Sequence, residues 1–220
     1  MNNDWLINRK EIVRYLGYRD QEPDEIMTRE IEECEQRFLK VVQPKSTYQV
    51  FDLIHQENRL FTSDLEFEFV GKSIEKHLKD CEKVAFSCLT LSQGVDELID
   101  QAQQEDMLHA LLYDAIANAS VEEARYQLEQ KIQMENPEWH INWLFGIGYG
   151  DLPLTLQPQF LTKIDAKQKI GLTVNDKCIL SPLKSVTGFV GLSEKKVKDP
   201  SCQQKSCQKC NLKSKCSYHR

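Results

Sequence analysis

Hydrophobic residues recur with a helical period in some parts of the 220-residue chain and alternate as in a strand in others. In a helix the apolar positions repeat every three or four residues, whereas in a half-buried strand every second residue is apolar. Caps, glycines and prolines mark where such elements begin and end. These rules predict helices over residues 8–17, 23–41, 73–79 and 106–133, and one more that begins at residue 95. They predict strands over residues 48–54, 65–69, 84–89, 178–180 and 185–192.

The order of these elements indicates the fold class. Helices come first, and strands and helices then alternate irregularly, without the repeated strand-helix-strand units of a parallel sheet. Residues 84–89 are apolar except for Ser87, which is typical of a strand buried on both faces. We therefore predict an α+β domain over residues 1–198, followed by a separate tail over residues 199–220.

The long predicted helix has an unusually small middle. Ala115, Ala117, Ala119 and Ser120 lie close together in its apolar stripe. Small side chains let another backbone or a ligand approach closely, and close helix packing is the simpler interpretation. Glu122 and Glu123 follow on the same helix, where neighbouring acids are usually solvated.

Charge is distributed unevenly along the chain. The net charge is −6, yet residues 200–220 contain five lysines or arginines and no acid, which leaves −11 for residues 1–199. An acidic body is repelled by phosphate, so a nucleic-acid partner is not expected. The apolar runs are short and interrupted by charges, so we expect no membrane span or signal segment, and a cytoplasmic location.

The cysteines point to metal chemistry at the end of the chain. Four of the eight have the spacing C-x4-C-x2-C-x5-C, namely Cys202, Cys207, Cys210 and Cys216. Four thiolates in one short segment suit zinc or an iron-sulfur cluster. Zinc ribbons usually contribute two CxxC pairs and this tail has one, which favours a four-iron cluster, with a zinc-bound tail as the alternative. The other cysteines are expected in the core.

A glycine-rich loop is the candidate binding element of the body. Gly146-Ile147-Gly148-Tyr149-Gly150-Asp151 joins a strand to a helix near Leu156, and such a loop can offer backbone N–H groups to an anionic or polar ligand. A tight turn is the alternative interpretation. Gly71-Lys72-Ser73 is not a phosphate-binding loop, because Glu66 stands where that motif needs a glycine.

Several segments in the second half of the chain resemble a known domain. Gly148-Tyr149-Gly150-Asp151, Leu172-Thr173, Pro182 and Ser185-Val186-Thr187-Gly188 are similar, in order and spacing, to the signature of the reactivation domain of cobalamin-dependent methionine synthase. The similarity covers roughly residues 108–193. Small standalone relatives of that domain resemble nearly the whole chain, including Arg14-Tyr15-Leu16-Gly17-Tyr18 and the cysteine tail.

The resemblance implies a curved antiparallel sheet with flanking helices that binds S-adenosylmethionine and presents its methyl group to cobalamin. It places the ligand at Gly148, Tyr149, Gly150 and Asp151, with Ser185 and Gly188 of the second signature; Lys184 can add a positive charge if it faces the same cleft. The cobalamin-binding motif Asp-x-His-x-x-Gly is absent from the chain, so the corrinoid is expected on a partner protein. Reductive methylation also needs one electron, from a donor such as flavodoxin or ferredoxin, and a tail cluster can serve as its entry point.

The chain departs from the family pattern at three positions. By the resemblance, Leu144 stands where the family has an arginine, Val190 where it has a tyrosine, and Asn118 where it has an acidic residue. The chain also has no homocysteine or folate module, so it is not a complete methyltransferase by itself. Three functions follow as hypotheses: an accessory to corrinoid reactivation, an iron-sulfur electron-transfer protein without S-adenosylmethionine, and a zinc-stabilised interaction module.

Overall fold

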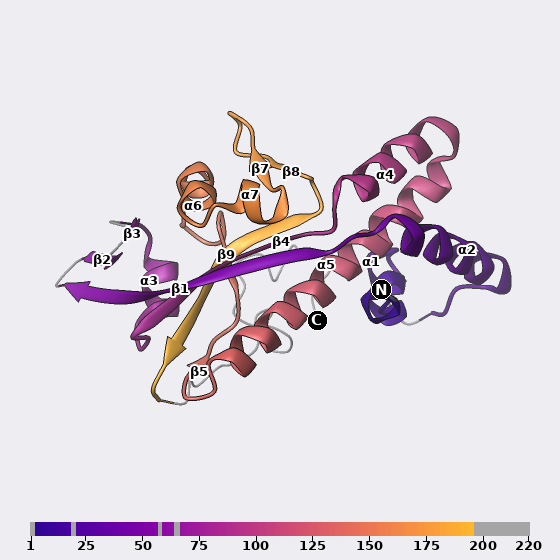
Figure 1. The fold of residues 1–220 in the computed structure, drawn as a ribbon. Helices are drawn as coiled ribbons and strands as arrows, with labels where there is room; N and C mark the ends of the chain where they lie inside the picture. The colour runs from indigo at the N-terminus through magenta and orange to yellow at the C-terminus, as the bar shows by residue number, and fades with distance from the viewer. Residues whose placement is uncertain (1–2, 19–20, 57–58, 64–66, 196–220) are drawn as a thin grey trace.

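The computed structural model describes residues 3–18, 21–56, 59–63 and 67–195. Over these residues an antiparallel sheet lies between two groups of helices (Figure 1). The helices are η1 (Asp4–Leu6), α1 (Arg9–Tyr15), α2 (Glu25–Val41), α3 (Lys72–Leu78), α4 (Gln93–Glu105), α5 (Met107–Glu135), η2 (Leu154–Leu156), α6 (Gln157–Lys163) and α7 (Ala166–Ile170). The strands are β1 (Lys45–Gln56), β2 (Arg59–Thr62), β3 (Phe67–Phe69), β4 (Lys83–Thr90), β5 (His140–Ile141), β6 (Phe145–Gly146), β7 (Thr173–Val174), β8 (Leu180–Ser181) and β9 (Ser185–Ser193).

The strand order in the main sheet is β3-β2-β1-β4-β9-β5, and β6 also pairs with β9. All these pairings are antiparallel, and β7 and β8 form a separate hairpin. Strands β4 and β9 are central and pair along their length, with Phe86 opposite Phe189. Because helices cover both faces of the sheet, nearly every residue of these two strands is buried.

The sheet separates two hydrophobic cores. On one face, Ala85 and Val190 pack against α1, α2, α4 and α5. On the other, Phe86 and Phe189 join a cluster of aromatic rings with Phe67 and with residues of α3, α6 and α7. In Figure 1 the helices α6 and α7 lie on the opposite side of the strands from α5. Residues 84–89 therefore lack a polar face because each face meets its own core.

The short β5–β6 segment is anchored to β9 by one buried side chain. The Oδ1 of Asn142 accepts the backbone N–H of Gly191 at 2.6 Å, and its Nδ2 donates to the carbonyl of His77 at 2.9 Å. The backbone N–H of Asn142 also donates to the Gly191 carbonyl at 3.0 Å. One asparagine thus fixes this segment against both β9 and α3.

Most of the predicted elements are present, and their ends follow the capping rules. The side chain of Asn8 accepts the N–H of Glu11 at the start of α1, as expected. Helix α2 begins one residue after Asp24, whose carboxylate caps it, rather than at Pro23. The elements η1, β2, α7 and β7 were not predicted, the strand predicted over residues 178–180 lies at Leu180–Ser181, and Leu65 lies outside the described residues. No helix in the described part of the chain is long and apolar enough to cross a membrane.

Candidate functional site

The glycine-rich loop follows β6 and forms a tight turn beside the start of β9. The N–H of Tyr149 donates to the Gly146 carbonyl at 3.1 Å, and the N–H of Ile147 donates to Thr187 of β9 at 3.1 Å. Gly148 and Gly150 have φ angles of 89° and 56°. A Cβ on Gly150 would lie 2.5 Å from the Ser73 hydroxyl, so this position requires glycine for two reasons. The side chain of Tyr149 is exposed in this loop.

Asp151 caps the helix α3. Its two carboxylate oxygens accept the backbone N–H groups of Lys72 at 2.8 Å and Ser73 at 2.9 Å. These bonds, the one from Ser73 first, lower the pKa of the Asp151 carboxyl group. The N–H groups of the Gly71-Lys72-Ser73 segment therefore bind a carboxylate of the protein itself. Through these two hydrogen bonds Asp151 holds the loop against α3.

Lys184 lies in the turn that leads into β9. Its ammonium group donates to Asp114 at 2.6 Å and to Asn118 at 2.8 Å, both on α5. The buried carboxylate of Asp96 accepts the N–H of Leu183 at 2.6 Å and that of Lys184 at 3.4 Å. Lys184 is therefore an ion-paired residue that ties the turn to α5, rather than a solvated lysine.

Ser185 and Gly188 mark the first half of β9. The hydroxyl of Ser185 donates to the Pro182 carbonyl at 2.7 Å, closing the turn. Gly188 pairs with Gly146, and a Cβ on Gly188 would lie 2.5 Å from both the Leu144 side chain and the Phe145 carbonyl. Glycine is needed at this position because β6 approaches β9 closely, and that approach sets the path of the loop.

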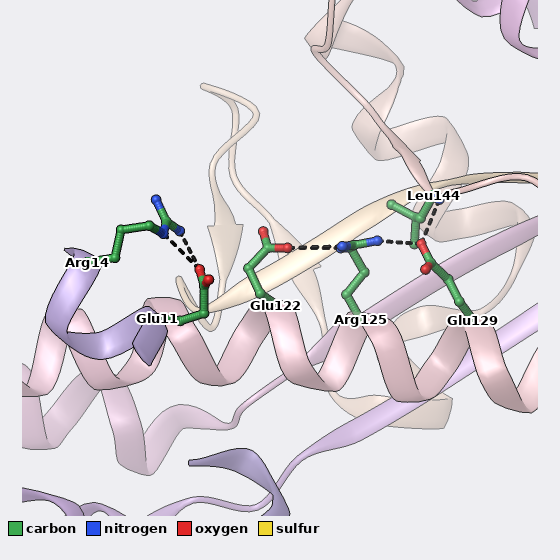
Figure 2. Close-up of polar contacts among 6 residues, drawn as sticks. All are labelled: Glu11, Arg14, Glu122, Arg125, Glu129 and Leu144. Carbon is green, nitrogen blue, oxygen red and sulfur yellow. Dashed lines mark hydrogen bonds and ion pairs between the residues drawn. The ribbon is translucent and has the colours of Figure 1, made fainter. Parts of the chain in front are cut away.

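A row of polar residues on α5 contacts Lys184 at one end and the backbone N–H of Leu144 at the other. We call it the α5 polar stripe; its members are Asp114, Asn118, Glu122, Arg125 and Glu129. The spacings of three and four residues place them on one side of the helix. Figure 2 shows its last three members projecting from the same side of α5. This stripe was not predicted, although the spacing of three and four residues between its polar members was a usable signal.

Arg125 is the centre of the stripe. Its guanidinium binds Glu129 at 2.5 Å and Glu122 at 3.1 Å, and only 10% of its side chain is exposed. The backbone N–H of Leu144 donates to the same Glu129 oxygen at 2.8 Å (Figure 2). Burial raises the pKa of the Glu129 carboxyl group, and Arg125 partly opposes that rise. Glu122 is thus paired rather than simply solvated, contrary to expectation.

Helix α1 extends the charged network at one end of the stripe. Arg14 binds Glu11 at 2.7 Å, and its guanidinium carbon lies 4.3 Å from the centre of the Tyr15 ring. Burial raises the pKa of the Tyr15 hydroxyl, and the negative charge of Glu122 adds to that rise. The Arg14–Glu11 pair and the stripe lie along the same side of α5 in Figure 2. Two arginines and three glutamates therefore lie along this side of α5.

Two family positions that differ in this chain are filled by core residues. Leu144 and Val190 are 2% and 0% exposed and belong to the core on the α5 side of the sheet. Neither position presents a charge or a hydroxyl group. Leu144 is nevertheless linked to a positive charge through Glu129. The backbone N–H of Leu144 and the guanidinium of Arg125 donate to the same carboxylate oxygen of Glu129.

Comparison with solved structures shows a likeness in fold. No family model matches the chain, and no curated protein matches it. Among solved structures, the crystal structure of the MetH reactivation domain bound to AdoHcy superposes with a TM-score of 0.60. The chain has the fold of the MetH reactivation domain. The match covers 84% of this chain and 74% of that chain, at 13% sequence identity.

The reactivation-domain fold confirms the predicted α+β class with an antiparallel sheet and flanking helices. At 13% identity the likeness concerns the architecture, and the ligand in that crystal belongs to that protein. The four tail cysteines predicted to bind metal lie outside the described residues. Within the described residues, no group of three or more histidine, cysteine, aspartate or glutamate side chains is arranged to hold a metal ion.

Proposed function

We propose that this chain assists cobalamin-dependent methyl transfer by binding S-adenosylmethionine and presenting it to a corrinoid on a partner protein. The observation that carries the proposal is the likeness of 84% of the chain to a reactivation domain that was crystallised with AdoHcy. Two of the signature segments that suggested this function, Gly148-Tyr149-Gly150-Asp151 and Ser185-Val186-Thr187-Gly188, belong to the loop after β6 and to the first half of β9, which are hydrogen-bonded to each other.

The α5 polar stripe supports an amino-acid ligand. S-adenosylmethionine carries an ammonium and a carboxylate at one end and a positively charged sulfonium in its middle. The carboxylates of Glu122 and Glu129 would bind the cationic groups and the guanidinium of Arg125 the ligand carboxylate, in exchange for part of the pairing that these three residues make with one another. Arg125 would thus supply, from α5, the positive charge that Leu144 does not.

The protein's own residues would hold and orient the ligand, while the corrinoid would supply the methyl-accepting metal. Tyr149 is exposed at the tip of the loop and would face the docked partner. The absence of Asp-x-His-x-x-Gly from the sequence supports a partner-bound corrinoid. An electron donor such as flavodoxin or ferredoxin, acting through the tail cysteines, completes the proposed reactivation.

The decisive experiment is calorimetric titration of anoxically purified protein with S-adenosylmethionine and with AdoHcy, at two temperatures. Saturable micromolar binding is expected, and Arg125→Met is expected to weaken it at least about tenfold, whereas Arg125→Lys retains part of it. Arg59→Met is the matched control, because Arg59 also pairs with a glutamate but lies on β2. Absence of heat with either ligand at both temperatures refutes the ligand-binding role.

A second candidate function has a specific observation in its favour. The buried side chains of Leu144 and Val190 leave the chain without two contacts that the family resemblance implies. This favours an iron-sulfur electron-transfer protein that kept the fold without the ligand, or a zinc-stabilised interaction module. Iron and zinc analysis of anoxically purified protein separates these two, and either metal without ligand binding supports this candidate over the first.

A further inference from the structure

Strand β1 has an open edge along most of its length. Residues 45–52 pair with β4 on one side, whereas β2 pairs only with residues 53–56 on the other. Among the described residues, no strand pairs with the second side of residues 45–52. In Figure 1 the β1 arrow passes in front of β4 and β9, at the margin of the sheet. An edge of this length is a template for another strand.

The register identifies the residues whose backbone groups face this edge. The N–H of Leu53 donates to Glu82 in the β4 direction, so the odd-numbered residues of β1 direct their hydrogen-bonding groups to β4. Because these groups alternate along an antiparallel strand, the even-numbered residues direct theirs outward. The outward-facing residues are Ser46, Tyr48, Val50 and Asp52.

The edge lacks the features that usually prevent pairing. Residues 46–51 read Ser-Thr-Tyr-Gln-Val-Phe, with no charge and no proline, and the pairing with β4 is regular throughout. Threonine, tyrosine, valine and phenylalanine favour strands. Charges stand only at the two ends, Lys45 and Asp52, and both are exposed.

We propose that this edge is the interface of a homodimer, in which β1 of one copy pairs antiparallel with β1 of a second copy. A two-fold axis near Gln49 brings the uncharged segments together and sets Lys45 of each copy beside the Asp52 end of the other. Strand β2 occupies the edge from Leu53 onward and so limits the register. The inference is independent of ligand binding by the chain.

Gln49 provides the test, because its side chain is exposed and lies close to the axis. Cross-strand neighbours on one face of an antiparallel pair are about 5 Å apart at Cβ. Gln49→Lys and Gln49→Glu each place like charges together across the axis and are expected to weaken self-association at least about tenfold. An equimolar mixture of the two variants is expected to restore it as a heterodimer. Glu68→Gln, on β3, is the control substitution and should not change association.

The measurement is sedimentation equilibrium of the reduced full-length chain up to about 1 mM, together with amide hydrogen exchange. Concentration-dependent dimerisation, with protection of the four outward-facing amides rising with dimer fraction, supports the proposal. A protein that stays monomeric at all concentrations overturns the proposal. If these amides are nevertheless protected at every dilution, another part of the same chain covers the edge, and the proposal is overturned as well. A dimer that neither Gln49 variant weakens also overturns it.

Discussion

The clearest effect of pH is expected at His77, at the end of α3. Its ring lies 4.7 Å from the Trp143 ring and 5.1 Å from the Phe145 ring, between centres. The Nε2 atom is buried and has no hydrogen-bond partner among the described residues. Burial disfavours the protonated imidazolium and lowers the pKa of His77 to about 4 from its ordinary value of 6.5.

The sign and size of the effect follow from linkage. Between pH 6.5 and about 4 the unfolded chain binds a proton at this residue and the folded chain does not, so folding stability falls as the pH falls. One pKa unit corresponds to about 1.4 kcal/mol. His77 alone is therefore expected to remove about 2 kcal/mol of unfolding free energy between pH 7 and pH 5.

The assay is urea unfolding of wild type and His77→Gln at both pH values, followed by circular dichroism. The variant should be less stable at pH 7 but should lose about 2 kcal/mol less than wild type on acidification, because glutamine does not titrate. His140→Gln is the matched control, since His140 is exposed on β5. If His77→Gln keeps the full wild-type loss, the imidazole is not neutral and buried as described, and the reasoning is refuted.

Three further substitutions probe the elements that position the loop, each by the same unfolding assay. Gly188→Ala is expected to cost about 3 kcal/mol, because the new methyl carbon would meet a β6 backbone oxygen at 2.5 Å; a loss below about 1 kcal/mol would contradict this close approach. Asn142→Ala should cost about 2 to 4 kcal/mol, since it leaves two buried backbone groups unpaired, and an unchanged midpoint would show that they find other partners. Lys184→Met should cost at most about 1 kcal/mol, because its ion-pair partner on α5 is half exposed; a larger loss would assign Lys184 a greater role in the fold.

Local patterns in the sequence were sufficient for most helices and for the central strands. The cap at Asn8 and the largely apolar run at residues 84–89 each depend on neighbouring residues, and both predictions are confirmed. The strand β2 was missed because it has four residues, too few to establish an alternating pattern. The glycine-rich turn was also recognised, since its glycines carry the conformational signal themselves.

The roles of the site residues depended on contacts between distant parts of the chain. Asp151 caps a helix that begins 79 residues earlier, and Lys184 binds Asp114, which precedes it by 70. No local pattern specifies such partners. Glu122 was predicted to be solvated, because the spacing of residues along a helix does not indicate which groups lie beside its polar face. In the structure the Arg125 guanidinium pairs with Glu122. The prediction of a metal site on the four tail cysteines stays untested.

The path of the loop beside β9 is set largely by main-chain contacts. At Gly188 a missing side chain lets two strands approach, and Asn142 binds backbone groups, which every residue carries. Such contacts constrain few residue identities, so the shape can persist while most of the sequence changes. A likeness in fold at 13% identity is consistent with this. Distant chains with this fold are therefore better sought by two features than by overall sequence similarity. One is the pair of facing glycines in β6 and β9, and the other is an asparagine whose side chain binds the backbone of β9 and of α3.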